Sequence, residues 1–408
     1  MKAGAFVLVS VALCFAESIG PVAAEPVIPT LPGVAPVPEN DPFYTVPADV
    51  AAYPDGAVLA SRPITAVAAQ LPIAASAWQV LYKTSTVGGA PTATVATILV
   101  PIDPWRGPGA RPLLSYQVAE DSVALHCAPS YTLRAGFGAT LGAGQADAVV
   151  LGAALSNGWA VVVPDYQGPQ SLWFDYPTTA HGVLDGVRAA RDFAPAGIGL
   201  DAPIGLMGYS GGAYASMVAA EQQPGYAPDL TLSGVAIGGL PGDLNDALAT
   251  VNGGAFAGFT VGGLVAFDRA DPQAGISSML NERGRQVLAD GEDQCGADYL
   301  AKYAMLDVSS LTVIPDPLAD PRLRSLMAAN SPGQNTPTGP VYEFHSTSDE
   351  VTRLGPADAV LDSYCAAGIP VRRDRLPGEH LTGYLASLQP SLAYLADRFD
   401  GRPVPDDC

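Results

Sequence analysis

Basic residues are scarce in this sequence. Its 408 residues include 20 Lys and Arg against 40 Asp and Glu, which gives a formal net charge of −20. Nucleic acids and anionic bilayers are bound through clustered Lys and Arg, because their phosphates must be neutralised. The shortage of cations therefore excludes nucleic acid as a favoured partner.

The sequence also has no apolar run near its start that could cross a bilayer. Residues 5–16 are apolar but fall short of the roughly 20 residues that a spanning helix needs. They follow Met1-Lys2 and precede Val22-Ala23-Ala24, whose small residues at −3 and −1 are typical of a cleavage site. We expect a signal peptide over residues 1–24, cleaved near Ala24, and a secreted, extracellular protein without an integral membrane span.

Cysteines are few, and none are spaced as C-x-x-C, which argues against a structural zinc site. H-E-x-x-H, P-loop and G-x-G-x-x-G patterns are absent as well, so we expect neither a metal nor a cofactor. Removal of the signal peptide takes away Cys14. An even set in an exported chain then favours two disulfides, in any of three connectivities, over four buried free thiols. The remaining cysteines are Cys127, Cys295, Cys365 and Cys408.

Apolar residues are plentiful at 48 %, enough for a large core, so a disordered chain is excluded. Residues 25–47 form the exception, with seven prolines in 23 positions. Proline fixes φ and lacks an N–H, so this composition favours an extended, polyproline-like backbone. We expect residues 25–50 to form an N-terminal arm that lies on the body.

From there, β-rich apolar runs alternate with helical patterns, which predicts an α/β fold with a mostly parallel sheet flanked by helices on both faces. The expected strands are residues 94–100, 112–116, 159–163, 204–207, 230–237, 341–344 and 371–376, and the expected helices are 147–156, 178–193, 212–222, 355–367 and 380–399. The alternation stops between about residues 238 and 340. A loop of that length without structure would be unusual, so we expect a helical insertion between two parts of the body, 51–237 and 341–408.

A candidate nucleophile lies in Gly208-Tyr209-Ser210-Gly211-Gly212, which matches the G-x-S-x-G nucleophile elbow. The pattern alone is weak, but a predicted strand precedes it and a predicted helix follows it. A sharp strand-to-helix turn exposes the serine hydroxyl and puts the Gly211 N–H at a helix N-terminus, where it can stabilise an oxyanion. The alternative is a structural serine in a glycine-rich turn.

The serine needs a general base, and the chain has four histidines. In the chain order Ser, acid, His, only His345 and His380 follow Ser210. His380 comes after the last predicted strand and Asp349 after an earlier one, so both would reach the carboxyl edge of the sheet beside Ser210. We therefore expect His380 as base and Asp349 as acid, with His345 at a strand end or lining a pocket. The competing acids are Asp358, Asp362 and Asp374, and Glu350 and Glu379 are expected to be solvated neighbours.

With these residues in place, nearly the whole mature chain resembles the secretory lipases, the family typified by Candida antarctica lipase A. The segments that carry the resemblance are SYQVAED at 115–121, residues 124–131 with Cys127, GYSGGA at 208–213, NGG at 252–254 with FAGF at 256–259, and EHLT at 379–382. Five segments in one order are far more specific than the elbow alone. The resemblance implies an α/β-hydrolase body with a helical lid inserted before the catalytic acid.

Carried over by position, the resemblance gives Ser210, Asp349 and His380 as the triad, and Asp121 with Gly211 as the oxyanion hole. The assignment of Asp121 to the oxyanion hole depends mainly on the resemblance and is supported by its place just after a predicted strand. The alternative is an aspartate that caps a loop. The resemblance also suggests the disulfide pairs Cys127–Cys295 and Cys365–Cys408.

The insertion contains a stretch, residues 255–265, that is apolar almost all round. We expect it to be part of the lid, with substrate-binding residues Phe256, Gly258, Phe259 and Leu264. In this interpretation glycines leave gaps beside the large side chains, so that an alkyl chain finds a narrow channel. The alternative is an ordinary buried helix between lid and body.

Together these features predict a secreted serine ester hydrolase, a lipase that cleaves acylglycerols and other carboxylic esters through an acyl-enzyme. Its partner would be a lipid or ester substrate, with transient contact to a lipid interface; oligomeric state is not predicted. The nearest alternative is a secreted esterase or acyltransferase of the same fold that acts on small or cell-envelope esters. A peptidase and a non-catalytic secreted binding protein are more remote alternatives.

Overall fold

The computed structural model describes residues 35–68, 71–136 and 147–408. The predicted signal peptide and residues 25–34 of the predicted arm lie outside the described residues. The described part of the arm is not extended throughout as expected: it contains two short 3₁₀ turns, η1 (Pro38–Asn40) and η2 (Pro42–Tyr44), and a third, η3 (Val50–Ala52), begins at its last residue. Pro38 and Pro42 each stand at the start of a turn, where the fixed φ of proline suits a helical turn and its missing N–H costs nothing.

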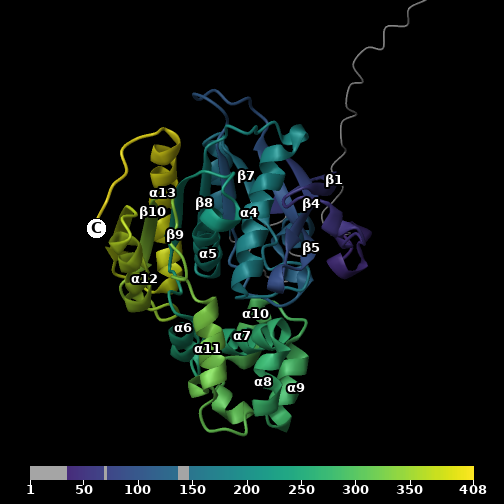
Figure 1. Ribbon diagram of the computed structural model, residues 1–408, viewed down its shortest axis with the longest axis vertical. Helices are drawn as coiled ribbons and strands as arrows, with labels where there is room; N and C mark the ends of the chain where they lie inside the picture. Colours follow the sequence, from purple (N-terminus) through teal and green to yellow (C-terminus); the bar gives the residue numbers. More distant parts are fainter. Residues whose placement is uncertain (1–34, 69–70, 137–146) are drawn as a thin grey trace, which may run out of the picture. The chain divides into compact units, whose positions relative to one another are not determined.

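A nine-stranded sheet forms the body (Figure 1). Its order is β1-β4-β5-β7-β6-β8-β9-β10-β11. The strands are β1 (Val58–Ile64), β4 (Ala75–Ser85), β5 (Pro91–Pro101), β6 (Leu113–Gln117), β7 (Ala160–Pro164), β8 (Ile204–Tyr209), β9 (Leu232–Gly238), β10 (Val341–Ser346) and β11 (Val371–Leu376). From β7 to β11 all neighbours are parallel, whereas β1, β4 and β5 pair antiparallel. The prediction of a mostly parallel sheet is confirmed.

All seven expected strands are present, but two strands of the nine-stranded sheet, β1 and β4, were not predicted. β1 and β4 pair antiparallel with each other, and β4 pairs with β5 over eleven residues. β1 is an edge strand with Pro63 inside it, and proline within an apolar run argues against a strand unless the strand lies at an edge. A separate two-stranded ribbon, β2 (Val67–Ala68) with β3 (Leu71–Pro72), follows β1.

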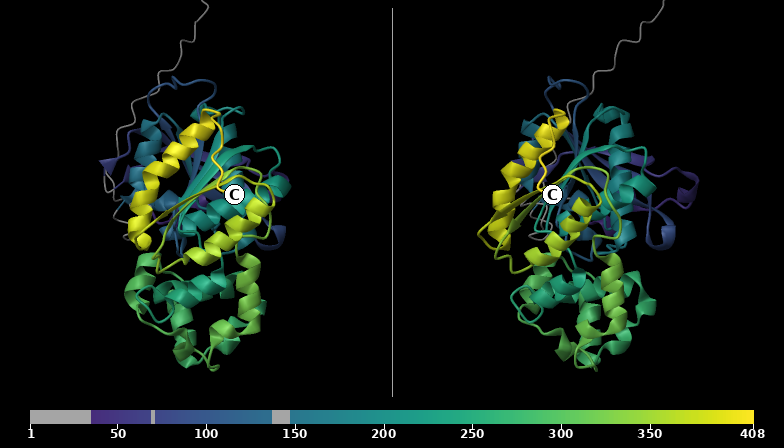
Figure 2. Two further views of the ribbon diagram at one scale, coloured as in Figure 1. Left: turned by 90° about the vertical axis from the view of Figure 1, so that its left-hand side faces the viewer. Right: turned by 60° about the vertical axis from the view of Figure 1, so that its left-hand side comes forward.

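Helices cover both faces of the sheet, and each face has its own buried apolar cluster. One cluster packs α4 (Tyr176–Asp192), α5 (Gly211–Tyr226) and α12 (Leu354–Ala366) against the sheet. The other packs α1 (Pro129–Ala135), α3 (Ala148–Ser156) and α13 (His380–Phe399) against the opposite face. Figure 2 shows α13, in yellow, running along one side of the twisted sheet. Strand β7 contributes side chains to both clusters, because successive side chains of a strand alternate between the two faces of the sheet. Val162 belongs to the first cluster, and Val161 and Val163 belong to the second.

The chain between β9 and β10 is helical and gathers beyond one end of the sheet (Figure 1). Its helices are α6 (Leu244–Val251), α7 (Ala257–Ala270), α8 (Ile276–Met279), α9 (Glu282–Gly291), α10 (Gly296–Tyr303) and α11 (Pro321–Asn330). They share a third apolar cluster with Trp173, Phe174 and Tyr214 of the body. Within the residues that the structure describes, no helix is both long and apolar enough to cross a bilayer.

The disulfide pairs suggested by the resemblance are confirmed as Cys127–Cys295 and Cys365–Cys408. The first joins the segment after β6 to the start of α10, and the second joins α12 to the last residue of the chain. Both bridges therefore hold segments that are far apart in the sequence.

We expect replacement of Cys365 and Cys408 by Ser to lower the free energy of unfolding by roughly 4 kcal/mol, the chain-entropy value for a loop of this size. The bridge spans 43 residues of sequence and lies at the exposed C-terminus, so ester hydrolysis should be unchanged. Chemical denaturation of the variant and the parent under oxidising conditions measures the difference. An identical midpoint and slope for both proteins would show that this bridge does not stabilise the fold.

Candidate active site

Ser210 lies on a sharp turn between β8, which ends at Tyr209, and α5, which begins at Gly211. Its φ of 54° is rare for a residue with a side chain, as expected for an elbow that points the hydroxyl away from the sheet. The turn needs glycine on both sides. A Cβ at Gly208 would overlap the carbonyl group of Gly212, and a Cβ at Gly212 would overlap the carbonyl oxygen of Gln117.

Hydrogen bonds link Ser210 to His380 and His380 to Asp349. Ser210 Oγ is 2.9 Å from His380 Nε2, and His380 Nδ1 is 2.7 Å from Asp349 Oδ2. The structure thus brings together the three residues that the sequence predicted as the triad. Asp349 lies 139 positions and His380 170 positions after Ser210 in the chain. This is the geometry that nucleophilic catalysis by serine requires.

Asp349 is held by the backbone of its own loop. Its Oδ1 accepts hydrogen bonds from the N–H groups of Val351 at 2.9 Å and Thr352 at 2.7 Å. Burial by itself would raise the pKa of Asp349, but the hydrogen bond and charge of His380 and the two N–H groups outweigh it. The pKa of Asp349 is therefore below its ordinary value, and the carboxylate is ionised and fixed in direction.

His380 is the first residue of α13, directly after the turn that follows β11. Its backbone N–H donates to Glu350 at 3.1 Å, and its carbonyl oxygen accepts from the Tyr209 hydroxyl at 2.8 Å. The ring is therefore positioned by contacts to its own main chain from two different segments. Glu350 is exposed, as expected for a solvated neighbour, and it also accepts this N–H.

The competing acids are occupied elsewhere in the fold. Asp358 accepts from Arg375 at 2.6 Å, Asp362 lies 2.7 Å from Arg373, and Asp374 accepts from Tyr342 at 2.9 Å. Glu379 caps the N-terminus of α13 together with Thr382. His345 is fully buried beneath Asp349 and does not contact Ser210 among the described interactions.

Asp121 and Gly211, the candidate oxyanion hole, lie against each other beside Ser210. Asp121 follows β6 with a φ of 44°, and a Cβ at Gly211 would overlap its carboxylate. Within the described residues, neither backbone N–H has a hydrogen-bond acceptor. Burial raises the pKa of the Asp121 carboxyl group to about 6, although the charge of His380 acts against this shift.

An apolar cavity opens at Ser210, Gly211 and Asp121. The space in it that is open to a water-sized molecule is about 30 Å³. The remaining walls come from the body and from helices α6 and α7, and are formed by Trp173, Phe174, Pro241, Ala247, Leu248, Val251, Phe259, Val351 and Thr352. Trp173 stacks on Phe174 with ring centroids 4.5 Å apart, and Phe259 meets Trp173 edge-on.

Of the four predicted substrate-binding residues, Phe259 alone is among the residues that line this cavity. Phe256 stacks on Phe259, and Leu264 is buried in the third apolar cluster. The prediction of a gap beside Gly258 is wrong, because a Cβ at this position would overlap the backbone of Tyr299 in α10. The glycine permits close helix packing instead. Trp173 and Phe174 had no signal in the sequence, since they come from the irregular segment before α4.

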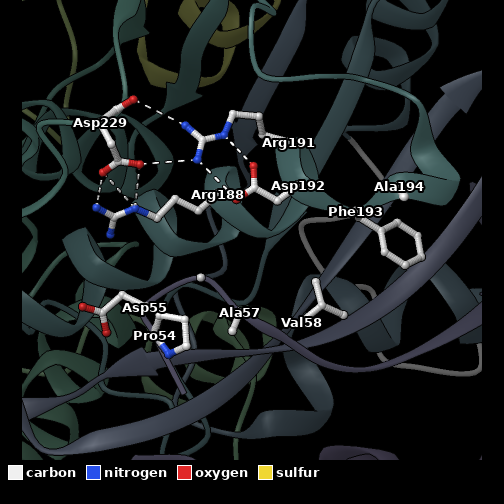
Figure 3. A pocket seen from close by; sticks show the side chains of 11 residues that line it. Pro54, Asp55, Ala57, Val58, Arg188, Arg191, Asp192, Phe193, Ala194 and Asp229 are labelled. Atoms are coloured by element: carbon white, nitrogen blue, oxygen red, sulfur yellow. Dashed lines mark hydrogen bonds and ion pairs between the residues drawn. The ribbon is translucent and has the colours of Figure 1, made fainter. Parts of the chain in front are cut away.

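A larger hollow, of about 500 Å³, lies between the start of β1 and the end of α4 and shares no residue with this cavity. Figure 3 shows Arg188 and Arg191 in it, both directed at Asp229. Arg188 also binds Asp185, and Arg191 binds Asp192. Because both cations are neutralised by neighbours, we interpret this cluster as a structural link rather than an anion site.

Two sets of possible metal ligands occur within the described residues, and both include His126. One contains Cys127 and Cys295, which are bonded to each other, and the other contains Glu39 and Asp293. The carboxylate oxygens lie 3.7 and 3.4 Å from His126 Nδ1, as in a loose ion-pair cluster. Exposed groups of this kind are common without an ion, so it offers no chemistry to the site at Ser210.

The elbow, the parallel sheet and the order of strands define an α/β-hydrolase fold. Residues 136–407 match the family model described as secretory lipase, and the chain belongs to this family of carboxylic ester hydrolases. The solved structure of Candida antarctica lipase A superposes with a TM-score of 0.85 at 30 % identity, over 92 % of this chain and 89 % of that one.

Two curated relatives differ in what their names state. A probable inactive lipase of Mycobacterium tuberculosis is 36 % identical over 377 residues, which is 91 % of this chain and 84 % of that protein. A secreted triacylglycerol lipase of Malassezia furfur is 29 % identical over 387 residues, 91 % of this chain and 82 % of that protein. Membership in the family therefore leaves the activity of an individual member to be decided by its site.

Proposed function

We propose that this protein is an active, secreted serine hydrolase that cleaves carboxylic esters, acylglycerols among them, through an acyl-enzyme on Ser210. The observation that carries the proposal is the continuous hydrogen-bonded series of Ser210, His380 and Asp349, at 2.9 and 2.7 Å. The name of the Malassezia furfur relative supports acylglycerols as the substrate class.

In the first half of the reaction, Ser210 Oγ attacks the ester carbonyl carbon while His380 Nε2 takes the hydroxyl proton. The carbonyl oxygen becomes an oxyanion, which the N–H groups of Asp121 and Gly211 stabilise. Collapse of the intermediate breaks the bond to the alcohol, and His380 returns the proton to the leaving oxygen. Ser210 then carries the acyl group.

In the second half, water replaces the alcohol. His380 removes a proton from the water as it attacks the acyl carbon, and the same N–H groups hold the oxyanion again. Departure of Ser210 Oγ, which regains the proton from His380, releases the carboxylic acid. Throughout, the ionised Asp349 keeps Nδ1 of His380 protonated and stabilises the imidazolium that forms.

The cavity at Ser210 is too small for an acyl chain, since about 30 Å³ holds roughly one water molecule. We therefore assign residues 238–340 as a lid that opens for substrate. Its final segment is anchored, because buried Glu221 of α5 accepts the N–H groups of Gly333 at 2.6 Å and Gln334 at 3.1 Å. The Cys127–Cys295 bridge anchors the start of α10. Opening of the cavity then requires movement of α6 and α7, which supply apolar walls of the cavity.

A hydrolysis profile tests the proposal against its alternatives. We expect turnover of p-nitrophenyl esters and of an emulsified triacylglycerol by the purified mature protein. Turnover of short esters alone would favour an esterase of small substrates. Absence of turnover, together with no labelling of Ser210 by a serine-reactive phosphonate, would overturn the proposal and group this protein with an inactive relative.

Phe259 should limit the acyl chain. Phe259→Ala removes an apolar wall of the cavity, so each further methylene that can be buried should add about 0.8 kcal/mol, roughly fourfold in kcat/KM. If the space left by the ring takes two further methylenes, the ratio of kcat/KM for octanoyl over butyryl esters should rise by about sixteenfold. Phe256→Ala is the matched control, because this ring stacks on Phe259 without lining the cavity. Equal ratios in the parent and both variants would place the acyl chain elsewhere.

A further inference from the structure

His345 lies beneath the proposed active site and is fully buried. Its Nδ1 is 2.8 Å from Glu343 Oε1, and its Nε2 is 2.7 Å from the carbonyl oxygen of Thr352. A carbonyl oxygen and an ionised carboxylate only accept hydrogen bonds. Both ring nitrogens must therefore carry hydrogen if Glu343 is ionised, and the ring is then an imidazolium.

The surroundings of Glu343 favour its ionised form. Its Oε2 lies 2.6 Å from Arg375 Nη1, and the other end of the same guanidinium, Nη2, lies 2.6 Å from Asp358. A proton on Glu343 would leave this arginine next to a neutral group inside the protein, which is costly. The Glu343 carboxyl group thus lies between the Arg375 guanidinium and the His345 ring.

Burial works against a charge on His345, but the hydrogen bond and charge of Glu343, the Thr352 carbonyl and the charge of Asp349 outweigh it. The pKa of His345 is therefore raised above its ordinary value. The direction of this pKa shift agrees with the hydrogen-bond geometry, because both ring nitrogens face acceptor atoms and neither faces a donor.

His345 is tied to Asp349 in two ways. The Thr352 carbonyl that accepts from His345 belongs to the residue whose N–H donates to Asp349 Oδ1 at 2.7 Å. In addition, His345 Nε2 lies 3.8 Å from Asp349 Oδ2, the oxygen that receives His380 Nδ1. The charges thus alternate from Asp358 through Arg375, Glu343 and His345 to Asp349.

We propose that His345 is a positioning residue: a buried imidazolium, hydrogen-bonded through both ring nitrogens, that holds the loop 349–352 and orients Asp349 behind His380. The role rests on the proposed function of the triad, although the charge on the ring does not. His345 touches neither substrate nor Ser210; it acts through Asp349.

The charge has a consequence for the base. A positive charge on His345 behind Asp349 disfavours a second positive charge on His380. The other titratable or charged groups near Asp349 and His380 are Glu343, Arg375, Glu350 and Asp121. Glu350 accepts the His380 backbone N–H, and Asp121, with a pKa of about 6, interacts with the charge of His380. Loss of the His345 charge with these groups unchanged should move the acid limb of the pH profile to higher pH.

The first experiment reads the charge directly. In NMR spectra of protein labelled with ¹⁵N-histidine, the four histidines give few ring signals. The signals of three of them are assigned by their loss in the variants His126→Gln, His181→Gln and His345→Gln. We expect the His345 ring to show two protonated nitrogens at pH 6.5, where an ordinary imidazole is about half protonated, because its pKa is raised. A neutral ring with one protonated nitrogen at pH 6.5 would overturn the proposal, whether or not the protein hydrolyses esters.

The second experiment reads the coupling. His345→Gln retains an N–H that can donate to the Thr352 carbonyl but carries no charge. We expect kcat/KM at the plateau of the pH profile to fall by about tenfold or less, with KM little changed. The midpoint of the acid limb should move to higher pH by about half a pH unit. His126→Gln, at the surface, should leave the limb in place. If the folded His345→Gln protein keeps the parent acid limb, the ring does not tune His380.

Discussion

Ser210→Ala should abolish ester hydrolysis, with a loss in kcat on the order of 10⁴ to 10⁶ by analogy with the removal of nucleophiles from other serine triads. The Ser210 hydroxyl oxygen lines the cavity and lies 2.9 Å from His380 Nε2, the ring nitrogen that does not face Asp349. Without it, no acyl-enzyme can form, and the N–H groups of Asp121 and Gly211 can provide only residual catalysis.

Folding should be nearly unaffected by this change. Alanine has the same Cβ as serine, so the strain at a φ of 54° is equal in both proteins, and the lost hydrogen bond is partly buried. Circular dichroism and the unfolding midpoint provide the control. A serine-reactive phosphonate should add to the parent at Ser210 and not to the variant. Retained turnover in a protein free of contaminating esterase would contradict the assignment of Ser210.

His380→Ala should cause a loss of similar size, on the order of 10⁴ or more in kcat, because Ser210 then lacks the group that removes its proton. His345, the other histidine after Ser210 in the chain, cannot take over: both of its ring nitrogens are engaged with Glu343 and Thr352, away from the serine. Steady-state kinetics on a single p-nitrophenyl ester measures the effect.

His345→Gln is the matched control for His380→Ala, since each removes one buried imidazole beside Asp349. We expect the two to differ by at least about a thousandfold in kcat, which is the difference between losing the base and losing a charge behind it. Comparable losses in two folded variants would mean that His345 takes part in the reaction itself. Near-normal activity of His380→Ala would remove His380 from the triad.

Features that depend on neighbouring residues were determined by the sequence alone. The strand before Ser210, the helix after it and the glycines around it follow from local patterns, because a sharp turn leaves no room for a Cβ at Gly208 or Gly212. The alternation of strands and helices predicted the parallel sheet in the same way. An even number of cysteines predicted two bridges, although only the resemblance suggested how they pair.

Features that depend on residues far apart in the chain were decided by the tertiary structure. Four acids followed Ser210 at plausible places, and only packing shows that Asp349 meets His380 while Asp358, Asp362 and Asp374 meet arginines or tyrosine. Periodicity cannot reveal such choices, since it describes which face of an element is apolar and not which element covers it.

The helix α7 shows the same division. Its apolar, glycine-rich sequence indicated burial, yet what lies over each glycine is set by α10, about 40 residues further along the chain, whose backbone fills the space beside Gly258. The cavity walls Trp173 and Phe174 and the partners of His345 were likewise beyond local inference. The sequence determined the elements and the candidate chemistry; only the folded chain decided which side chains meet, because contact energies between distant segments are settled jointly by the whole packing arrangement.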